Sequence, residues 1–138
     1  MPNEALVAQV KHIIGMAKSG QVEQAYAAYK TLFESKEFVT YSVEDRRTAI
    51  KLVVNAKIPP VNPAQHIVDA HRAAMRPLEE MIGEKGDPND FLLLGICCLF
   101  IGDEKRAGNM FRAGLNGERE RNPQSDLCGA LMKWVAAV

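Results

Sequence analysis

The sequence predicts an all-α protein of stacked antiparallel helical hairpins, an α-solenoid of about seven helices with a C-terminal capping helix. Three observations lead to this prediction. Apolar residues recur at helical spacing along almost the whole chain, whereas strand-like alternation is almost absent. The helical segments are joined by short connections, which force neighbouring helices to run antiparallel. Turns inside the hairpins fall near residues 20, 61 and 102, and this spacing of about 41 residues is typical of helical repeats.

The first two helices are expected at residues 4–18 and 21–35, where apolar side chains recur on one face of each segment. Ser19 and Gly20 interrupt the pattern between them. Residues 38–41 have a strand-like composition, but the stretch is very short. We therefore expect it to be a loop that tucks Phe38 and Tyr41 under a helix end.

The third helix is expected to follow Ser42, whose side chain would cap it, and to end near residue 56. The prolines of residues 57–61 stop it, because proline lacks a backbone donor and restricts the residue before it. Asn62 and Pro63 then start a fourth helix that reaches about residue 83. Pro77 lies inside that helix and predicts a kink or a restart.

A turn rich in glycine and proline precedes a fifth helix, which begins near residue 87 or 89 and ends at residue 101. Gly102 and Asp103 turn the chain into a sixth helix, which we expect to give way to a polar run after Gly117. Asn122 and Pro123 open a last helix that reaches residue 138.

The chain of 138 residues is expected to form one domain, residues 1–138, around one core. Its 17 basic residues balance 17 acidic residues, so the formal net charge is zero. A nucleic-acid-binding protein needs a surplus of basic residues, so we expect no nucleic-acid partner, and RNA binding is the least favoured alternative. A chain close to neutrality repels its own copies little, which favours self-association.

We also expect no membrane partner and a cytoplasmic location. The first ten residues include Glu4 and lack the basic and apolar regions of a signal peptide. The longest apolar run, residues 91–101, is far shorter than the roughly 20 residues needed to cross a bilayer. Three cysteines, two of them adjacent, form no disulfide framework, which indicates a reducing compartment.

The side chains with reactive potential are expected to be structural. Cys97 and Cys98 diverge by about 100° on one helix and lack the C-x-x-C spacing of zinc sites, so we expect buried free thiols. His66 and His71 do not have the i, i+4 spacing of a helical metal site, which favours a solvated helix face. No nucleophile context, phosphate loop or acid pair is present. We therefore expect no catalytic residue, no metal and no cofactor, and a protein that is not an enzyme.

Residues 91–117 carry a pattern of large and small residues at fixed helical positions on both sides of a glycine turn: Phe91, Leu94, Gly95, Cys98, Gly102, Ala107, Phe111 and Gly114. This pattern resembles the tetratricopeptide repeat, although Cys98 replaces the usual tyrosine. The small residues Gly95 and Ala107 are expected to let two helices approach closely, while Phe91 and Phe111 fill the space beside them. The N-terminal pair resembles the family in its second helix only, and residues 41–83 carry no motif.

The resemblance implies a protein–protein interaction module, such as an adaptor, scaffold or chaperone-like protein, that binds a peptide or helix of a partner in a groove. The groove-facing positions of the family correspond to four residues of the fifth helix: Leu92, Ile96, Leu99 and Phe100. A polar face of the third helix, with a lysine of the first helix expected nearby, is a second candidate surface: Arg47, Lys51, Asn55 and Lys11. The resemblance implies that such a face grips an acidic peptide or a C-terminal carboxylate.

The helix at residues 91–101 is apolar on all sides, which indicates burial on all sides. Either the last helix or a neighbouring hairpin covers its outer face, or part of that face forms a groove or a self-association surface. The alternative function is therefore a structural, self-assembling protein in which this helix and Trp134 mediate a homodimer.

Overall fold

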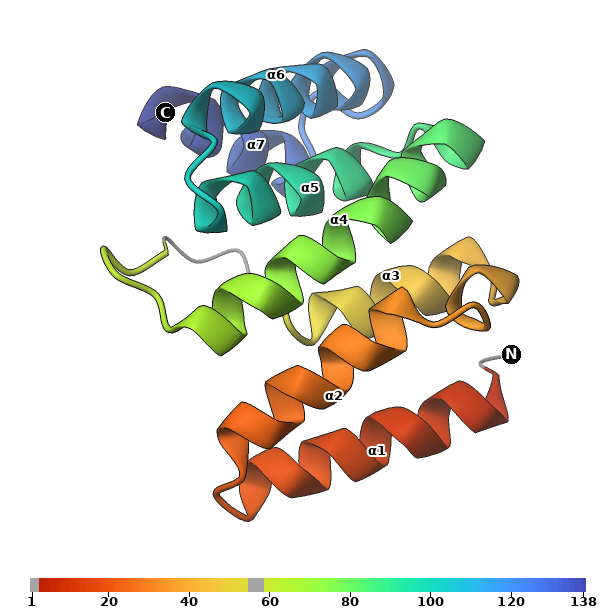
Figure 1. Ribbon diagram of the computed structural model, residues 1–138. Helices are drawn as coiled ribbons and strands as arrows, with labels where there is room; N and C mark the ends of the chain where they lie inside the picture. Colours follow the sequence, from red (N-terminus) through yellow and green to blue (C-terminus); the bar gives the residue numbers. More distant parts are fainter. Residues whose placement is uncertain (1–2, 55–58) are drawn as a thin grey trace.

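The computed structural model describes residues 3–54 and 59–138, which form seven α-helices and one 3₁₀ turn and contain no strand (Figure 1). The all-α class and the predicted number of helices are therefore confirmed. The helices are α1 (Glu4–Lys18), α2 (Val22–Glu34), α3 (Val43–Lys51), α4 (Gln65–Lys85), α5 (Pro88–Phe100), α6 (Glu104–Arg121) and α7 (Asp126–Ala137), and the 3₁₀ turn spans Phe38–Thr40.

Side-chain caps and glycine turns begin and end several helices at the predicted residues. The Ser42 hydroxyl accepts the backbone N–H of Asp45 at 3.1 Å and caps α3, as predicted. Asp87 caps α5 by accepting the backbone N–H two residues further on, at 2.8 Å. Gly20 and Gly102 have φ of 90° and 84°, a conformation that glycine adopts without strain, and they turn the chain after α1 and α5.

The middle of the chain departs from the predicted boundaries. Helix α3 ends at Lys51, and the predicted extension to residue 56 reaches residues that the structure does not describe. Helix α4 begins at Gln65, behind Ala64, rather than behind Asn62. It also continues through Pro77 without a restart. One missing backbone donor is tolerated there because α4 is held along its length by packing on α2 and α5.

Helices α6 and α7 also have shifted ends. Helix α6 continues to Arg121 rather than ending near Gly117, because glutamate and arginine are good helix formers and nothing breaks the helix earlier. Helix α7 begins at Asp126, where the Ser125 hydroxyl accepts the N–H of Cys128 at 3.0 Å. The cap rather than the preceding proline therefore sets its start.

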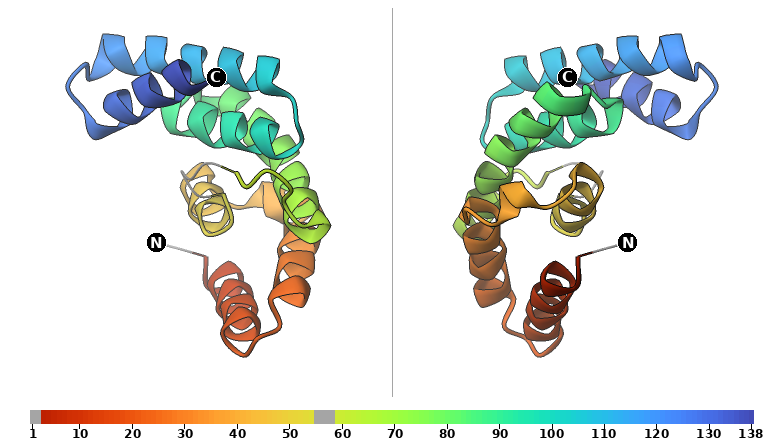
Figure 2. Two further views of the ribbon diagram at one scale, coloured as in Figure 1. Left: turned by 90° about the vertical axis from the view of Figure 1, so that its left-hand side faces the viewer. Right: turned by 90° about the vertical axis from the view of Figure 1, so that its right-hand side faces the viewer.

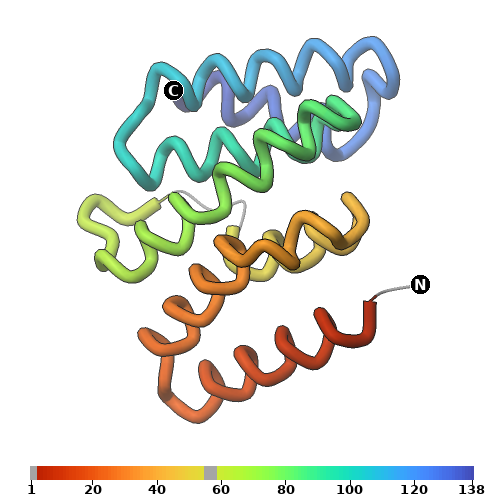
Figure 3. Tube along the Cα trace, turned by 45° about the vertical axis from the view of Figure 1, so that its right-hand side comes forward, coloured from red at the N-terminus to blue at the C-terminus, as the bar shows by residue number. Residues whose placement is uncertain are grey.

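The helices follow one another along a curved row in which most sequence neighbours lie side by side. Helices α1 and α2 run antiparallel, as do α5 and α6, and the trace leads from α1 at one end to α6 and α7 at the other (Figure 3). Helix α3 is the exception, because α4 packs mainly on α2 and α5 rather than on α3. The long connection between α3 and α4 makes this arrangement possible. Figure 2 shows α1 and α3 on the same side of α2 and α4.

The most extensive helix contact joins α5 and α6, and two of the small residues in the predicted pattern lie in it. A Cβ added to Gly95 would lie 2.4 Å from the Phe111 ring, and a Cβ added to Gly114 would lie 3.0 Å from the Phe91 Cβ. Each glycine therefore makes room for an aromatic residue of the other helix. Phe111 is fully buried and stacks on Trp134 of α7, with ring centroids 5.2 Å apart.

The segment after α2 is not a strand and buries two aromatic rings, as predicted. Phe38 lies in the 3₁₀ turn and is fully buried, and its ring contacts those of Phe33 and Tyr41 edge-on, with centroids 5.3 and 6.1 Å apart. This cluster closes the end of α2 and leads the chain into α3.

No helix in the described part of the chain combines the length and the apolar character that a membrane span needs.

Candidate functional site

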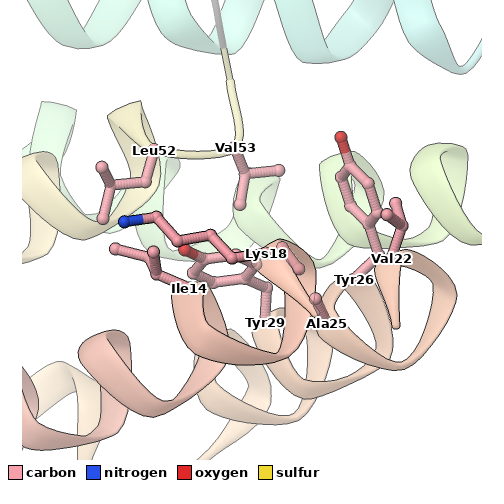
Figure 4. A pocket seen from close by; sticks show the side chains of 9 residues that line it. Ile14, Lys18, Val22, Ala25, Tyr26, Tyr29, Leu52 and Val53 are labelled. Atoms are coloured by element: carbon pink, nitrogen blue, oxygen red, sulfur yellow. The ribbon is translucent and has the colours of Figure 1, made fainter. Parts of the chain in front are cut away.

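An apolar groove runs between α1 and α3, over a floor formed by α2. Its narrow part, between α1 and α3, has a volume of about 110 Å³. Its wide part has a volume of about 350 Å³ and extends over α2 (Figure 4). Leu52, directly after α3, lines both parts, so the two hollows adjoin at this residue, and together they are called the groove below.

The periodicity of α1 produces one wall of this groove. Val7, Val10 and Ile14 are spaced three or four residues apart, so they share the face that lines it. Leu6 and Ile13 of the same helix are buried in the core. Helix α1 therefore has an apolar surface wider than its own contact with α2, and part of this surface remains open.

Two large apolar side chains at the wide part of the groove remain exposed. Val22 at the start of α2 is 46% exposed, and Leu52 on the opposite side is 45% exposed. Between them the floor is formed by Ala25 and Tyr29, which are buried (Figure 4). Single exposed apolar residues are ordinary, but these two border one apolar hollow, which is typical of a binding site.

A hydrogen bond closes the narrow end of the groove. The backbone N–H of Asn3 donates to Asp45 Oδ2 at 3.0 Å and joins the start of α1 to the first turn of α3. The side chain of Asn3 also accepts the N–H of Leu6 at 3.1 Å and caps α1. The two walls are therefore tied together at their N-terminal ends, and the groove widens toward their C-terminal ends.

Two lysines of α1 border the groove. Lys11 lines the narrow part beside Thr48 of α3, and Lys18 lines the wide part, where its side chain extends toward Leu52 in Figure 4. Both are exposed, and within residues 3–54 and 59–138 no carboxylate forms an ion pair with either of them. Asp45 is the one acidic residue among the described residues that line the groove.

The polar residues predicted on the third helix do not lie together along this groove. Arg47 donates from Nε and Nη2 to the two carboxylate oxygens of Asp90 at 2.7 and 2.8 Å, and its Nη2 lies 3.4 Å from Asp87. The hydrogen bonds to Asp90 raise the pKa of Arg47, so the guanidinium stays charged. The prediction that Arg47 grips a partner is therefore wrong, because its charge is used to join α3 to α5. Lys51 is exposed at the end of α3, and Asn55 lies outside the described residues.

The predicted groove residues of α5 are mostly covered. Leu92 and Ile96 are buried, so the prediction that these two face a partner is wrong. Leu99 and Phe100 are half-buried, and the Phe100 ring stacks on that of His71, with centroids 3.7 Å apart. The apolar helix packs between α4 and α6, which explains the burial of its faces.

His71 is a buried side chain rather than part of a solvated helix face, so that prediction is wrong. Its imidazole Nδ1–H donates to the Ile67 carbonyl at 2.7 Å, and the side chain is 2% exposed. Since a carbonyl can only accept, the proton of the neutral ring is on Nδ1. Burial lowers the pKa of His71, because the charged form is poorly solvated there.

The lowered pKa of His71 predicts a loss of stability in mild acid. Below the unfolded-state pKa of about 6.5 the unfolded chain takes up a proton that the folded chain excludes. The free energy of unfolding should therefore fall between about pH 7 and 5, by up to about 1.4 kcal/mol per pH unit from this group. Urea denaturation at several pH values in this range gives the change of the free energy of unfolding with pH. This change should be smaller for His71→Asn than for the wild type, whereas His12→Asn, at an exposed residue, should show the wild-type change. An equal change for all three proteins would contradict the prediction.

The cysteines offer no reactive centre. Cys97, Cys98 and Cys128 are free and buried. Burial raises the pKa of Cys97 and Cys98, so both stay protonated, whereas nucleophilic and redox chemistry needs a thiolate. In the described part of the chain no group of three or more potential ligands is arranged to hold a metal ion.

Comparisons with known proteins found no match. No protein-family description matches the chain, and no curated protein or solved structure does so either. The resemblance of residues 91–117 to the tetratricopeptide repeat therefore stays a prediction.

Sequence reasoning identified one residue of the groove, Lys11, and missed Ile14, Lys18, Val22 and Leu52. The sequence contained a signal for Ile14 and Lys18, because they follow Lys11 at i+3 and i+7 and so share its face of α1. No local signal marked Leu52, because its place depends on where α3 ends and on how α3 lies across from α1.

Proposed function

We propose that this chain is a protein-binding module that accepts a segment of a partner protein in the groove between α1 and α3. The observation that carries the proposal is the open apolar hollow of about 350 Å³ with Val22 and Leu52 exposed at its border. Covering each of these half-exposed side chains would stabilise a complex by about 1 kcal/mol. The predicted tetratricopeptide resemblance supports the same function, as an adaptor or chaperone-like protein.

The surfaces on which self-assembly was predicted are used inside the chain. Trp134 is 9% exposed and stacks on Phe111, and Leu92 and Ile96 of α5 are buried. Binding a different protein is therefore the better-supported function. The free cysteines favour a reducing compartment, and we place the proposed function in the cytoplasm.

A photo-crosslinking experiment tests the proposed function. The photoreactive residue p-benzoylphenylalanine is placed at Leu52 or, as a control, at Met132, a 51% exposed residue of α7. In cells that express each protein, irradiation should attach a partner at position 52 and not at position 132. Mass spectrometry then identifies the partner, which is purified for binding measurements.

The affinity for the purified partner should depend on the groove. Leu52→Asp puts a charge against the apolar lining and should weaken binding at least about tenfold, or about 1.4 kcal/mol. Met132→Asp should leave the affinity unchanged. Equal crosslinking at both positions, or equal affinities of both variants for every crosslinked protein, would contradict the proposed function.

A further inference from the structure

Lys11 and Lys18 are distinguished by their place beside an apolar groove, whereas the ion pairs of the described residues are all formed by arginines. Arg46 pairs with Glu84 and Arg47 with Asp90, and the partly buried Arg106 pairs with Glu79. Lys11 and Lys18 form no ion pair with any residue that the structure describes. The groove therefore has an uncompensated positive border.

The spacing of the two lysines follows from their position on one helix. They are separated by seven residues of α1, or about 10 Å along its axis, and lie on nearly the same face. The one acid of the described lining, Asp45, already accepts the Asn3 N–H at the closed end. A ligand in the groove thus meets two ammonium groups about two helical turns apart, with apolar side chains between them.

The lining of the groove also selects the conformation of a ligand. Most of its lining side chains are apolar, such as Val10, Ile14 and Leu52, and its few hydroxyl groups, such as that of Tyr29, would satisfy only part of a peptide backbone. An extended peptide would place unpaired backbone N–H and C=O groups against these side chains, which is unfavourable. The described residues contain no strand whose edge could pair with it. A helix satisfies its own backbone and presents only side chains, so it suits this lining.

Residues 3–54 and 59–138 supply no free helix with this character. Each of the seven helices buries residues in the folded chain. The exposed apolar residue of α7, Met132, is followed by Lys133, whose charge would be repelled by the border of the groove. This part of a second copy therefore lacks the complementary charge, and the exposed Val39 lies in a 3₁₀ turn rather than on a helix.

We infer that the ligand of the groove is an acidic amphipathic helix of a different protein. Its apolar stripe packs between α1 and α3, and carboxylates beside the stripe, about two turns apart, meet Lys11 and Lys18. The inference rests on the proposed function and adds the fold and charge of the partner segment. Electrostatic complementarity of this kind contributes to specificity and to the association rate.

A helical peptide library tests this inference without knowledge of the natural partner. Each displayed peptide has about five turns and a randomised apolar stripe of Leu, Ile, Met, Phe and Ala. The positions beside the stripe are drawn from Glu, Gln and Lys. Selection is carried out in parallel on the wild-type chain and on Lys11→Glu/Lys18→Glu, with circular dichroism to show that both proteins are folded.

The wild-type chain should enrich glutamate and the charge-reversed variant should enrich lysine at the same flanking positions. A selected acidic peptide should bind the wild type about tenfold more tightly than its Glu→Lys version, and this preference should shrink between about 50 and 300 mM salt. A version of the peptide with a central proline should lose binding. Leu52→Asp should abolish binding, and Met132→Asp should not.

The outcomes separate this inference from the proposed function. Peptides that depend on Leu52 but show no preference for glutamate, or that tolerate the central proline, overturn the inference and leave the groove as a binding site. Selection that yields no binder sensitive to Leu52→Asp overturns both. A wild-type dimer in sedimentation experiments that dissociates in Leu52→Asp identifies a second copy as the ligand and overturns the inference.

Discussion

Replacing Arg47 by methionine is expected to lower the free energy of unfolding by about 3–5 kcal/mol. Asp90 is fully buried, and both of its carboxylate oxygens accept hydrogen bonds from this one guanidinium, at 2.7 and 2.8 Å. Without Arg47 the carboxylate stays in the interior with neither its charge partner nor its donors. Breaking one side of a buried pair costs more than the pair contributes, because the remaining charge is left without solvation.

Urea denaturation of two further variants separates this effect from a general sensitivity to arginine loss. Arg106→Met removes an ion pair with Glu79 in which both side chains are substantially exposed, so its effect should stay below about 1 kcal/mol. The double variant Arg47→Met/Asp90→Leu should be more stable than Arg47→Met alone, because no unpaired charge is then left fully buried, and Asp87, the other partner of Arg47, is partly exposed to solvent. A loss for Arg47→Met as small as that for Arg106→Met would contradict the expected role of the pair.

The same ion pair bears on the groove. Helix α3 packs little on α4, its neighbour in sequence, and two successive arginines join it to α4 and α5 in addition to its buried apolar residues. Arg46 reaches Glu84 at the end of α4, at 2.8 Å, while Arg47 reaches Asp90 in α5. These ion pairs attach α3 to α4 and α5. Leu52, directly after α3, is thereby held at the border of the groove, opposite α1. The position of one groove wall thus depends on polar contacts made at some distance from the groove.

This dependence explains why the fold was more predictable from the sequence than the site. Helix periodicity, the Ser42 cap and the turns at Gly20 and Gly102 are local signals, and the structure contains each of them. The pairing of Arg47 with Asp90 joins residues 43 positions apart, and their spacing carries no signal of it. The sequence showed a polar face on the third helix, but only the packing of that helix shows that the face is turned toward an acid.

The surroundings of the apolar helix α5 were also hard to predict from the sequence. A helix without a polar face is expected to be buried, but the sequence alone does not show which residues cover it. The structure places α5 between α4 and α6, which buries Leu92 and Ile96 and leaves Leu99 and Phe100 half-buried. Among the described residues an open apolar hollow lies instead beside α1, whose amphipathic pattern is ordinary.

Replacing Gly95 by alanine is expected to destabilise the protein by about 1–3 kcal/mol, although alanine is intrinsically favoured over glycine within a helix by about 1 kcal/mol. The new Cβ would lie 2.4, 2.7 and 2.9 Å from three carbons of the Phe111 ring. That ring cannot move away easily, because it is fully buried and stacked on Trp134. The cost therefore comes from forcing α5 and α6 apart.

Gly15→Ala is the matched control, because Gly15 is an exposed residue inside α1 and a Cβ added there meets no atom within 4 Å. It should raise the free energy of unfolding by about 0.5–1 kcal/mol, so the same substitution in two helices should have opposite signs. In Gly95→Ala/Phe111→Leu the smaller side chain should relieve part of the clash, so that Gly95→Ala costs less in the Phe111→Leu background than in the wild type. Thermal and urea denaturation measure these differences. A stabilising effect of Gly95→Ala would mean that α5 and α6 do not approach as closely as their glycines allow.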